Sequence, residues 1–334
     1  MERHMILLAT LLLGGVLALS PRPASAQQPY YLYDRGDGIP TSLLGTYVRK
    51  GELLAYSFYE YTRDSTHEYK PSEMGFKGPR AGEDFFGKLE QHEFLLFFAY
   101  GFTDWLAVEF ESAVYTTATL KKAKSDPSTM PKKLREDGLG DTEMQIRLRW
   151  LKEGDYWPEG VFFFETVFPL QSDKKLIGTQ DWELSPGLVF TKGFGPFGTL
   201  AFRFAFTYSA KGGDFEFGEY AIEYLKRLSP NWLVALAFEG EQDEQSIIGE
   251  VQYSLSKNIA LKVNCGFGIT KKAPDFAPEI GLLFRFRGSR PSFHDFHQFH
   301  RPVAHHFRRP AERRQDDARR RASEVATVIG AKDS

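Results

Sequence analysis

Cysteine is almost absent from this chain of 334 residues, which contains one, Cys265. A single cysteine cannot form an internal disulfide, so the sequence excludes a small secreted scaffold held together by disulfides. Long apolar runs are also scarce, and the mean hydropathy is −0.37. After residue 26 no stretch approaches the roughly 20 apolar residues that a membrane-spanning helix needs. The sequence therefore predicts no transmembrane helix in residues 27–334.

The first 26 residues have the layout of a secretory signal peptide. Arg3 and His4 precede a short apolar run over 6–19, and Ala24 and Ala26 supply the small residues of a cleavage site. The run is too short for a membrane anchor. We therefore expect cleavage after Ala26 and export of the remaining chain.

Charge is unevenly distributed along the sequence. Residues 287–334 contain eleven Lys and Arg against six Asp and Glu, whereas residues 27–286 carry a net charge of about −8. His294, His297 and His300 have a spacing that could bind a metal on a helix. Nearby prolines interrupt such a helix, which favours a solvated tail, disordered or partly helical. We expect no metal, no cofactor and no nucleic-acid partner.

Residues 142–151 alternate by the letter between apolar and charged side chains. Met144, Ile146 and Trp150 share one parity, while Arg147 and Arg149 share the other. A period of two places the sets on opposite faces of a β-strand. Either a soluble half-buried sheet or a membrane barrel with a polar interior explains one such strand.

Twelve segments of strand character, most with ten or more residues, decide between these alternatives. They are 52–64, 88–100, 105–120, 141–152, 158–170, 179–192, 197–209, 215–228, 232–241, 245–255, 259–270 and 276–286. Tight turns alternate with generally longer polar connections, notably 65–87 and 121–140, which is typical of outer-membrane barrels. Aromatic residues near the segment ends fit interfacial girdles. Those residues are Tyr100, Trp105, Trp150, Trp157, Trp182 and Trp232.

The predicted fold is all-β, a transmembrane antiparallel up-and-down barrel of about 12 strands with short periplasmic turns and longer extracellular loops. Four regions follow. They are a signal peptide (1–26), a periplasmic N-terminal segment (27–51), the barrel (52–286) and a basic His- and Arg-rich tail (287–334). We expect the protein in the outer membrane, surrounded by its lipid, with the tail in the periplasm. The oligomeric state is left open.

If the apolar rows face lipid, charged side chains line the lumen. The candidates are Glu109, Glu111, Glu143, Arg147, Arg149, Glu165, Glu183, Arg203, Glu219, Glu223, Glu239, Glu250, Lys262, Glu279 and Arg285. Ten acids face five bases, which predicts an acidic interior with its densest patch at Glu109, Glu111 and Glu143. Two alternatives stay open, a barrel filled by its own ion pairs and a narrow pore for solutes.

The first two segments are harder to orient because large apolar groups occur at both parities. Leu95 and Phe97 point into the lumen if Phe94, Phe98 and Tyr100 point outward. An apolar patch inside the first hairpin would be the one indication of an apolar ligand.

Three stretches carry a resemblance to a known family. They are "GTYVRKGELLAYSFYEYTRD", "AYGFTDWLAVEFE" and "GLGDTEMQIRLRWL". They resemble the outer-membrane barrels associated with the meta-cleavage pathway of phenol degradation, which are regarded as transporters. The matching positions are Tyr100, Gly101, Thr103, Asp104, Glu109, Gly138, Gly140 and Asp141. The resemblance covers roughly the first half of the barrel and implies its fold more than a solute. The tail departs from the usual pattern, in which the last strand ends the chain.

The predicted function is an outer-membrane channel or transporter for small solutes, with aromatic or hydrophobic compounds as candidates. One alternative is a filled structural or surface-presenting barrel. A remote alternative is a lipid hydrolase, which needs a serine beside a histidine base. The body offers only His67 and His92, and no motif joins either to Ser65, Ser72 or Ser112. We therefore expect no enzyme and no catalytic residues.

Overall fold

The computed structural model describes residues 38–43, 46–210 and 213–287. The predicted signal peptide (1–26) and nearly all of the tail (287–334) lie outside this part of the chain. The position of the tail in the periplasm therefore stays a prediction. No helix among the described residues is long and apolar enough to cross a membrane.

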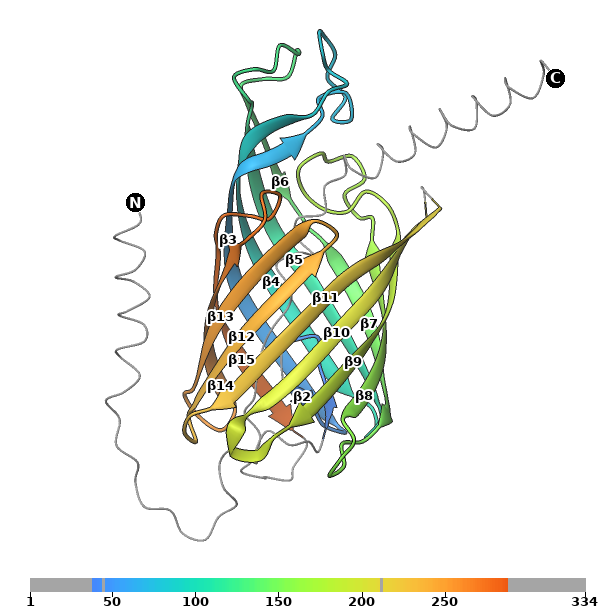
Figure 1. Cartoon of the computed structure of the whole chain (residues 1–334), viewed down its shortest axis with the longest axis vertical. Helices are drawn as coiled ribbons and strands as arrows, with labels where there is room; N and C mark the ends of the chain where they lie inside the picture. The colour runs from blue at the N-terminus through green and yellow to red at the C-terminus, as the bar shows by residue number, and fades with distance from the viewer. Residues whose placement is uncertain (1–37, 44–45, 211–212, 288–334) are drawn as a thin grey trace, which may run out of the picture.

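Twelve antiparallel strands form a closed barrel (Figure 1). Its strands are β3 (Glu52–Tyr69), β4 (Phe85–Gly101), β5 (Leu106–Lys121), β7 (Thr142–Leu151), β8 (Glu159–Phe168), β9 (Glu183–Gly193), β10 (Thr199–Ser209), β11 (Asp214–Arg227), β12 (Trp232–Glu241), β13 (Glu244–Ser254), β14 (Ile259–Gly268) and β15 (Ala277–Arg287). Each pairs with its sequence neighbours, and β15 pairs with β3 to close the wall. Closure leaves no unpaired barrel edge, which is the condition for a sheet to exist in lipid.

The alternation seen in the sequence sets which side chains face outward. On β7, Met144, Ile146 and Trp150 are exposed while Arg147 and Arg149 are buried. The same pattern holds along the other strands, so the outer surface is apolar and aromatic and the interior is charged. A soluble protein would have the reverse arrangement, and the predicted transmembrane barrel is confirmed.

The connections at the two ends of the barrel differ in length (Figure 1). At the short-turn end the hairpins close over a few residues, one of them through the 3-10 helix η3 (Gly195–Phe197). The opposite, long-loop end carries residues 70–84, 122–132 and 169–182. Two connections at the long-loop end, 210–213 and 242–243, are also short, so the alternation of loop lengths is incomplete.

One predicted loop is wrong in part. Within 121–140, residues Lys133–Gly138 form strand β6, which pairs with the upper part of β5. β6 takes the place beside β5 that β7 occupies lower down, since β7 pairs with residues 106–112 of β5. Together with the long strands β3 and β4, this strand raises one side of the barrel above the rest (Figure 1).

The raised wall has its own apolar core. Tyr69, Phe85, Leu120, Met130 and Ile177 are buried there, between strands and all three long loops. Polar contacts fasten the loops as well, because Glu136 Oε2 accepts the backbone N–H groups of residues 175 and 176, each at 2.7 Å. The long loops are therefore packed structure on this side of the barrel.

The described residues before β3 include a segment that lies inside the wall. Two short strands, β1 (Ile39–Pro40) and β2 (Tyr47–Val48), pair with each other near the short-turn end. We call residues 38–43 and 46–48 the inner segment. Gly101 permits the backbone beyond it to pass, because a Cβ at that position would collide with the carbonyl of Arg49. The inner segment therefore belongs to the filling of the barrel at that end.

Candidate functional site in the barrel lumen

All fifteen charged residues predicted to line the lumen point inward, and each is at most 8 % exposed. They come from ten strands, with β5 and β7 contributing the most closely spaced groups. Outward neighbours on the same strands, such as Phe202 and Ile280, are half exposed. Strand parity therefore places all fifteen charges on the inner surface.

Acids outnumber bases on the inner surface by more than the sequence predicts. The described barrel strands bury fifteen carboxylates and six basic groups. Six of these charges are additional to the predicted set. They are Glu52, Glu60, Asp64, Glu93, Glu159 and Arg227. Four of the six lie on β3 and β4, which bury no basic side chain of their own among the described residues, while Arg285 of β15 lies 3.5 Å from Glu52.

Four of the acids lie in a row that crosses five neighbouring strands. Glu250 is directly opposite Asn264, which is opposite Glu279, and the row continues to Glu60 and Glu93. We call these five residues the acidic row. Side chains directly opposite each other in a sheet have Cβ atoms roughly 4.5–5.5 Å apart, and like charges there repel. The row therefore concentrates negative charge at one level of the lumen.

Two groups partly balance this row. Lys262 Nζ is 2.9 Å from Glu279 and 3.4 Å from Glu250. The Tyr56 hydroxyl donates to Glu279 at 2.6 Å, and Lys262 lies over the Tyr56 ring at 5.3 Å. One lysine between two carboxylates leaves the negative sign of this wall unchanged.

A second network runs around the opposite wall. Glu109 Oε2 is 3.5 Å from Arg147 Nη1, and Arg147 donates to Gln145. Gln145 donates in turn to Glu165 at 2.7 Å. Arg203 completes the chain, with Nη2 at 3.8 Å from Glu165 and 3.0 Å from Glu219. Acids and bases alternate within this network, which joins three carboxylates to two guanidinium groups.

An aromatic ring lies inside this second network. Phe163 on β8 has the guanidinium of Arg203 4.8 Å from its ring centroid and that of Arg147 at 5.5 Å. Both distances fit a cation–π contact. Gly187, directly opposite Phe163 on β9, leaves the space that the ring occupies. The two arginines are therefore held by packing as well as by charge.

The acidic patch predicted at Glu109, Glu111 and Glu143 is divided in the structure. Glu111 and Glu143 are direct cross-strand neighbours, as expected. Glu109 belongs to the second network instead, because Arg147 and the inner segment both contact it. The three predicted glutamates therefore do not form one isolated group, and the acidic row is a separate set of four carboxylates at one level.

The inner segment is bound to the lumen by its backbone. The N–H of Ser42 donates to Glu109 Oε2 at 2.9 Å, and the Ser42 hydroxyl donates to the same oxygen at 2.5 Å. Arg149 donates to the carbonyl of Gly38, and its Nη1 is 3.1 Å from Glu159. Two predicted lumen residues therefore hold this segment.

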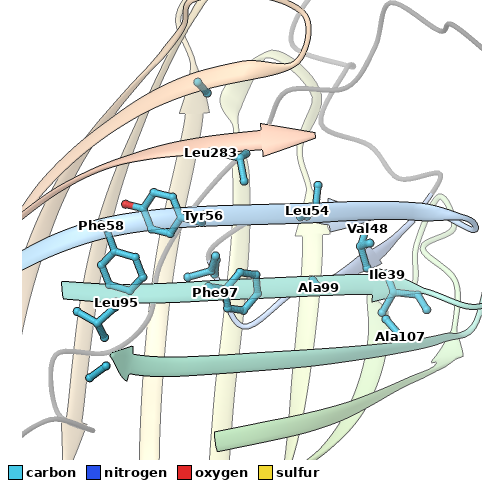
Figure 2. Packing of buried hydrophobic residues seen from close by; sticks show 13 residues of the cluster. Ile39, Val48, Leu54, Tyr56, Phe58, Leu95, Phe97, Ala99, Ala107 and Leu283 are labelled. Carbon is cyan, nitrogen blue, oxygen red and sulfur yellow. The ribbon is translucent and has the colours of Figure 1, made fainter. Parts of the chain in front are cut away.

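The inner segment also packs against the first hairpin through apolar contacts (Figure 2). Ile39, Leu43 and Val48 pack in one cluster with inward residues of β3, β4 and β5. Leu95 and Phe97 belong to this cluster and point inward, as predicted. The apolar inner patch therefore exists, and the chain's own inner segment covers part of it.

Neither histidine of the body joins a serine in the contacts that the structure describes. His92 lies on the outer face, with Nδ1 2.6 Å from the Tyr59 hydroxyl. His67 Nδ1 is 3.2 Å from Asp64. No group of three or more His, Cys, Asp or Glu among the described residues has a geometry that could hold a metal.

The missed acids carried a readable signal. Glu93 has the same parity as Leu95 and Phe97, and Glu60 has the same parity as Tyr56 on β3. The sequence alone does not place either residue, because large apolar groups at both parities of these strands hide which face is inward. The inward turn of the inner segment carried no comparable signal, since its residues show no alternation to compare with the barrel.

The comparisons with known proteins bear on the fold. No known family model and no curated protein matches the sequence. The structure is similar to that of an outer membrane channel from Pseudomonas putida F1, with a TM-score of 0.52 and 12 % identity over 75 % of this chain and 98 % of that one. The NanC porin (TM-score 0.43, 10 % identity, 69 % and 98 % covered) and the KdgM porin in complex with disordered oligogalacturonate (0.42, 9 %, 70 % and 99 %) are less similar. The chain thus has the fold of the outer-membrane β-barrels.

Proposed function

We propose that this protein is an outer-membrane channel for small solutes and that its acidic row gives the passage a preference for cations. The observation that carries the proposal is the inner surface itself, with fifteen buried carboxylates against six bases inside a closed barrel. The likeness in fold to an outer membrane channel agrees with it.

The physical reason is the low dielectric of the barrel wall. A passage lined by one sign of charge focuses the field and raises the local concentration of the opposite ion. Glu60, Glu93, Glu250 and Glu279 share one level, so a cation meets their combined potential there. The second network adds little to this potential because its acids and bases alternate.

A finer proposal concerns the chemistry of the solute. Tyr56, Phe58, Leu95 and Phe97 form a buried apolar surface inside the first hairpin, next to the acidic row and partly covered by the inner segment. Such a surface accepts an aromatic or hydrophobic body. This agrees with the resemblance to barrels associated with phenol degradation.

A filled, non-transporting barrel is the second candidate. The inner segment favours it, because its backbone and apolar side chains occupy the short-turn end of the lumen. We infer a non-enzymatic role in either case. The two candidates differ in one measurable property, the conductance of the purified protein.

Planar bilayers with the purified barrel test the proposal. Under a KCl gradient the reversal potential should report cation preference, and Glu60→Gln with Glu93→Gln should reduce it. The effect should weaken near 1 M salt, where the Debye length is about 3 Å. Glu83→Gln with Asp137→Asn, two exposed acids, serves as the control of equal charge and should leave the reversal potential unchanged.

Two results would contradict the proposal, the first its channel and the second its acidic row. Absence of conductance in every preparation would favour the filled barrel. Conductance with the same reversal potential in the Glu60 and Glu93 variant would show that the acidic row does not face the path of the ions.

A further inference from the structure

The outer surface of the raised wall changes from aromatic to basic along its strands. On β4 the exposed outward residues begin at the short-turn end with Tyr100, Phe98 and Phe94 and reach Lys88 near the long-loop end, where one exposed aromatic residue, Phe86, follows it. On β5 the exposed Tyr115 is followed outward by Lys121. The boundary between the two kinds of surface therefore crosses neighbouring strands together.

Strand register gathers the basic side chains into two adjacent rows. Lys88 is directly opposite Lys121, and Lys121 is directly opposite Lys133 on β6. In the next row, Arg63 is opposite Glu90 on β4, and Arg135 reaches the same row through Thr119 of β5. We call Arg63, Lys88, Lys121, Lys133 and Arg135 the basic patch, and all five are exposed.

This arrangement is unfavourable for the isolated protein. Three lysines directly opposite one another on adjacent strands repel. Lys121 Nζ is 3.0 Å from Glu90, but both side chains are well exposed, and such surface pairs contribute little. An anion bound across the row would relieve the repulsion.

The height of the patch fits the head-group region of the membrane. Lys88 is twelve residues from Tyr100 along β4. With a rise of about 3.4 Å per residue and a strand tilt of about 40°, the two lie about 31 Å apart along the membrane normal. The apolar band of such barrels is about 25 Å tall. If Tyr100 marks one interface, Lys88 lies just beyond the other.

We propose that the basic patch binds the phosphate groups of phosphorylated lipids in the outer leaflet, with lipid A as their representative. Lysine binds phosphate as a point charge, and a row of three offers adjacent sites on one face. The exposed aromatic surface below the patch contacts the acyl chains of the same lipid. The site depends on the barrel and its orientation, and it is independent of whether the lumen conducts.

Binding of lipid A by the detergent-purified full chain tests this. We compare bisphosphorylated and dephosphorylated lipid A by retention in native mass spectrometry and by the temperature at which the folded form is lost on gels. The variant Lys88→Gln, Lys121→Gln and Lys133→Gln should bind the phosphorylated lipid at least fivefold more weakly. The control Lys152→Gln, Lys226→Gln and Lys257→Gln removes three lysines near the short-turn end and should bind normally.

A third variant guards against a folding defect. Replacing the same three lysines of the patch by arginine keeps the charge and should retain binding. Equal binding by the glutamine variant and the unmodified chain would overturn the proposal, as would equal binding of dephosphorylated lipid A. If inorganic phosphate alone produced the same thermal shift as the lipid, the patch would be a free-anion site and the lipid assignment would fall.

Discussion

At the scale of single residues, glycine decides where the interior has room for a large ring. Phe163 lies over Gly187, between the guanidinium groups of Arg147 and Arg203. A Cβ at Gly187 would collide with the Phe163 ring and approach the carbonyl oxygen of Phe204 at 2.6 Å. The backbone contact cannot be relieved by rotating a side chain.

We therefore expect Gly187→Val to destabilise the barrel by about 1–3 kcal/mol, the usual range for overpacking an interior. Gly249→Val is the matched control, because Gly249 is also within a strand and its Cβ would meet no atom within 4 Å. Urea unfolding in detergent, followed by the gel shift of the folded form, measures both. Equal midpoints for the two variants would contradict the steric argument.

Asp126 is a single residue whose carboxylate stabilises the loop 122–132. Its carboxylate accepts hydrogen bonds from the Tyr69 hydroxyl at 2.9 Å and from the N–H of Ser128 at 2.7 Å. Burial alone would raise the pKa of Asp126, but the hydrogen bonds from Ser128 and Tyr69 and the charge of Lys122 outweigh it, and the pKa is lowered. The ionised form therefore stabilises the folded loop.

The lowered pKa of Asp126 makes the stability of the loop 122–132 depend on pH. Because the folded-state pKa lies below the unfolded value, the stabilisation is complete above the ordinary Asp pKa of about 3.9 and is lost as pH falls through the lower folded value. Hydrogen exchange in residues 122–132, corrected for intrinsic rates, should rise over that window. Asp126→Asn should reduce this pH dependence, while Glu83→Gln in the exposed loop 70–84 should not. An unchanged profile in the Asp126 variant would contradict the assignment.

At the scale of elements, strand parity carried most of what the sequence could predict. Observed strand ends agree with the predicted segments within a few residues for most strands, since an apolar row facing lipid leaves a clear period of two. β3 is the main exception. A register shift between Asp64 and His67 interrupts the alternation of apolar and polar residues in this strand. The alternation therefore does not predict that the strand continues through residues 65–69.

The partners inside the lumen were less predictable than the faces. Parity showed that Glu109 and Arg147 point inward, but their contact depends on the register between β5 and β7. The alternation of apolar and polar residues does not predict β6, because Lys133, Arg135 and Glu136 leave this strand without an apolar row. Sequence thus predicts the face of a residue in a barrel, while register decides its neighbours.

The packing of the inner segment against the first hairpin can be tested by truncating its buried side chains. Ile39 and Val48 are fully buried against the first hairpin. Ile39→Ala with Val48→Ala removes apolar contacts that contribute about 1–3 kcal/mol at each site. We expect hydrogen exchange over 38–50 to accelerate at least tenfold, and any conductance to increase.

Ile248→Ala is the control for this variant, because it truncates a fully buried aliphatic side chain in a different cluster of the wall. It should leave exchange in the inner segment unchanged. Acceleration of exchange by both variants alike would mean that the barrel as a whole has loosened. In that case the apolar contacts of Ile39 and Val48 would not explain the position of the inner segment.

For the whole molecule, closure connects the fold to a simple physical property. β3 pairs with both β4 and β15, so unfolding of the wall has no barrel edge from which to begin. The outer surface is apolar around the barrel, with exposed residues such as Phe98, Met144, Phe202 and Leu236 on separate strands. Detergent can therefore cover this surface without separating the strands.

We expect the protein to fractionate with outer membranes and to migrate differently on gels before and after boiling, because the closed barrel stays folded in cold detergent. The boiled chain should run near its full mass, and the unboiled chain should run as a compact species. Arg147→Ala with Arg203→Ala leaves the backbone pairing intact while removing two buried cations from the acidic interior. That variant should lose the compact species at a lower temperature, whereas Lys152→Ala, an exposed change, should not. A protein that stays in the aqueous phase and migrates identically with and without heat would contradict the closed transmembrane barrel.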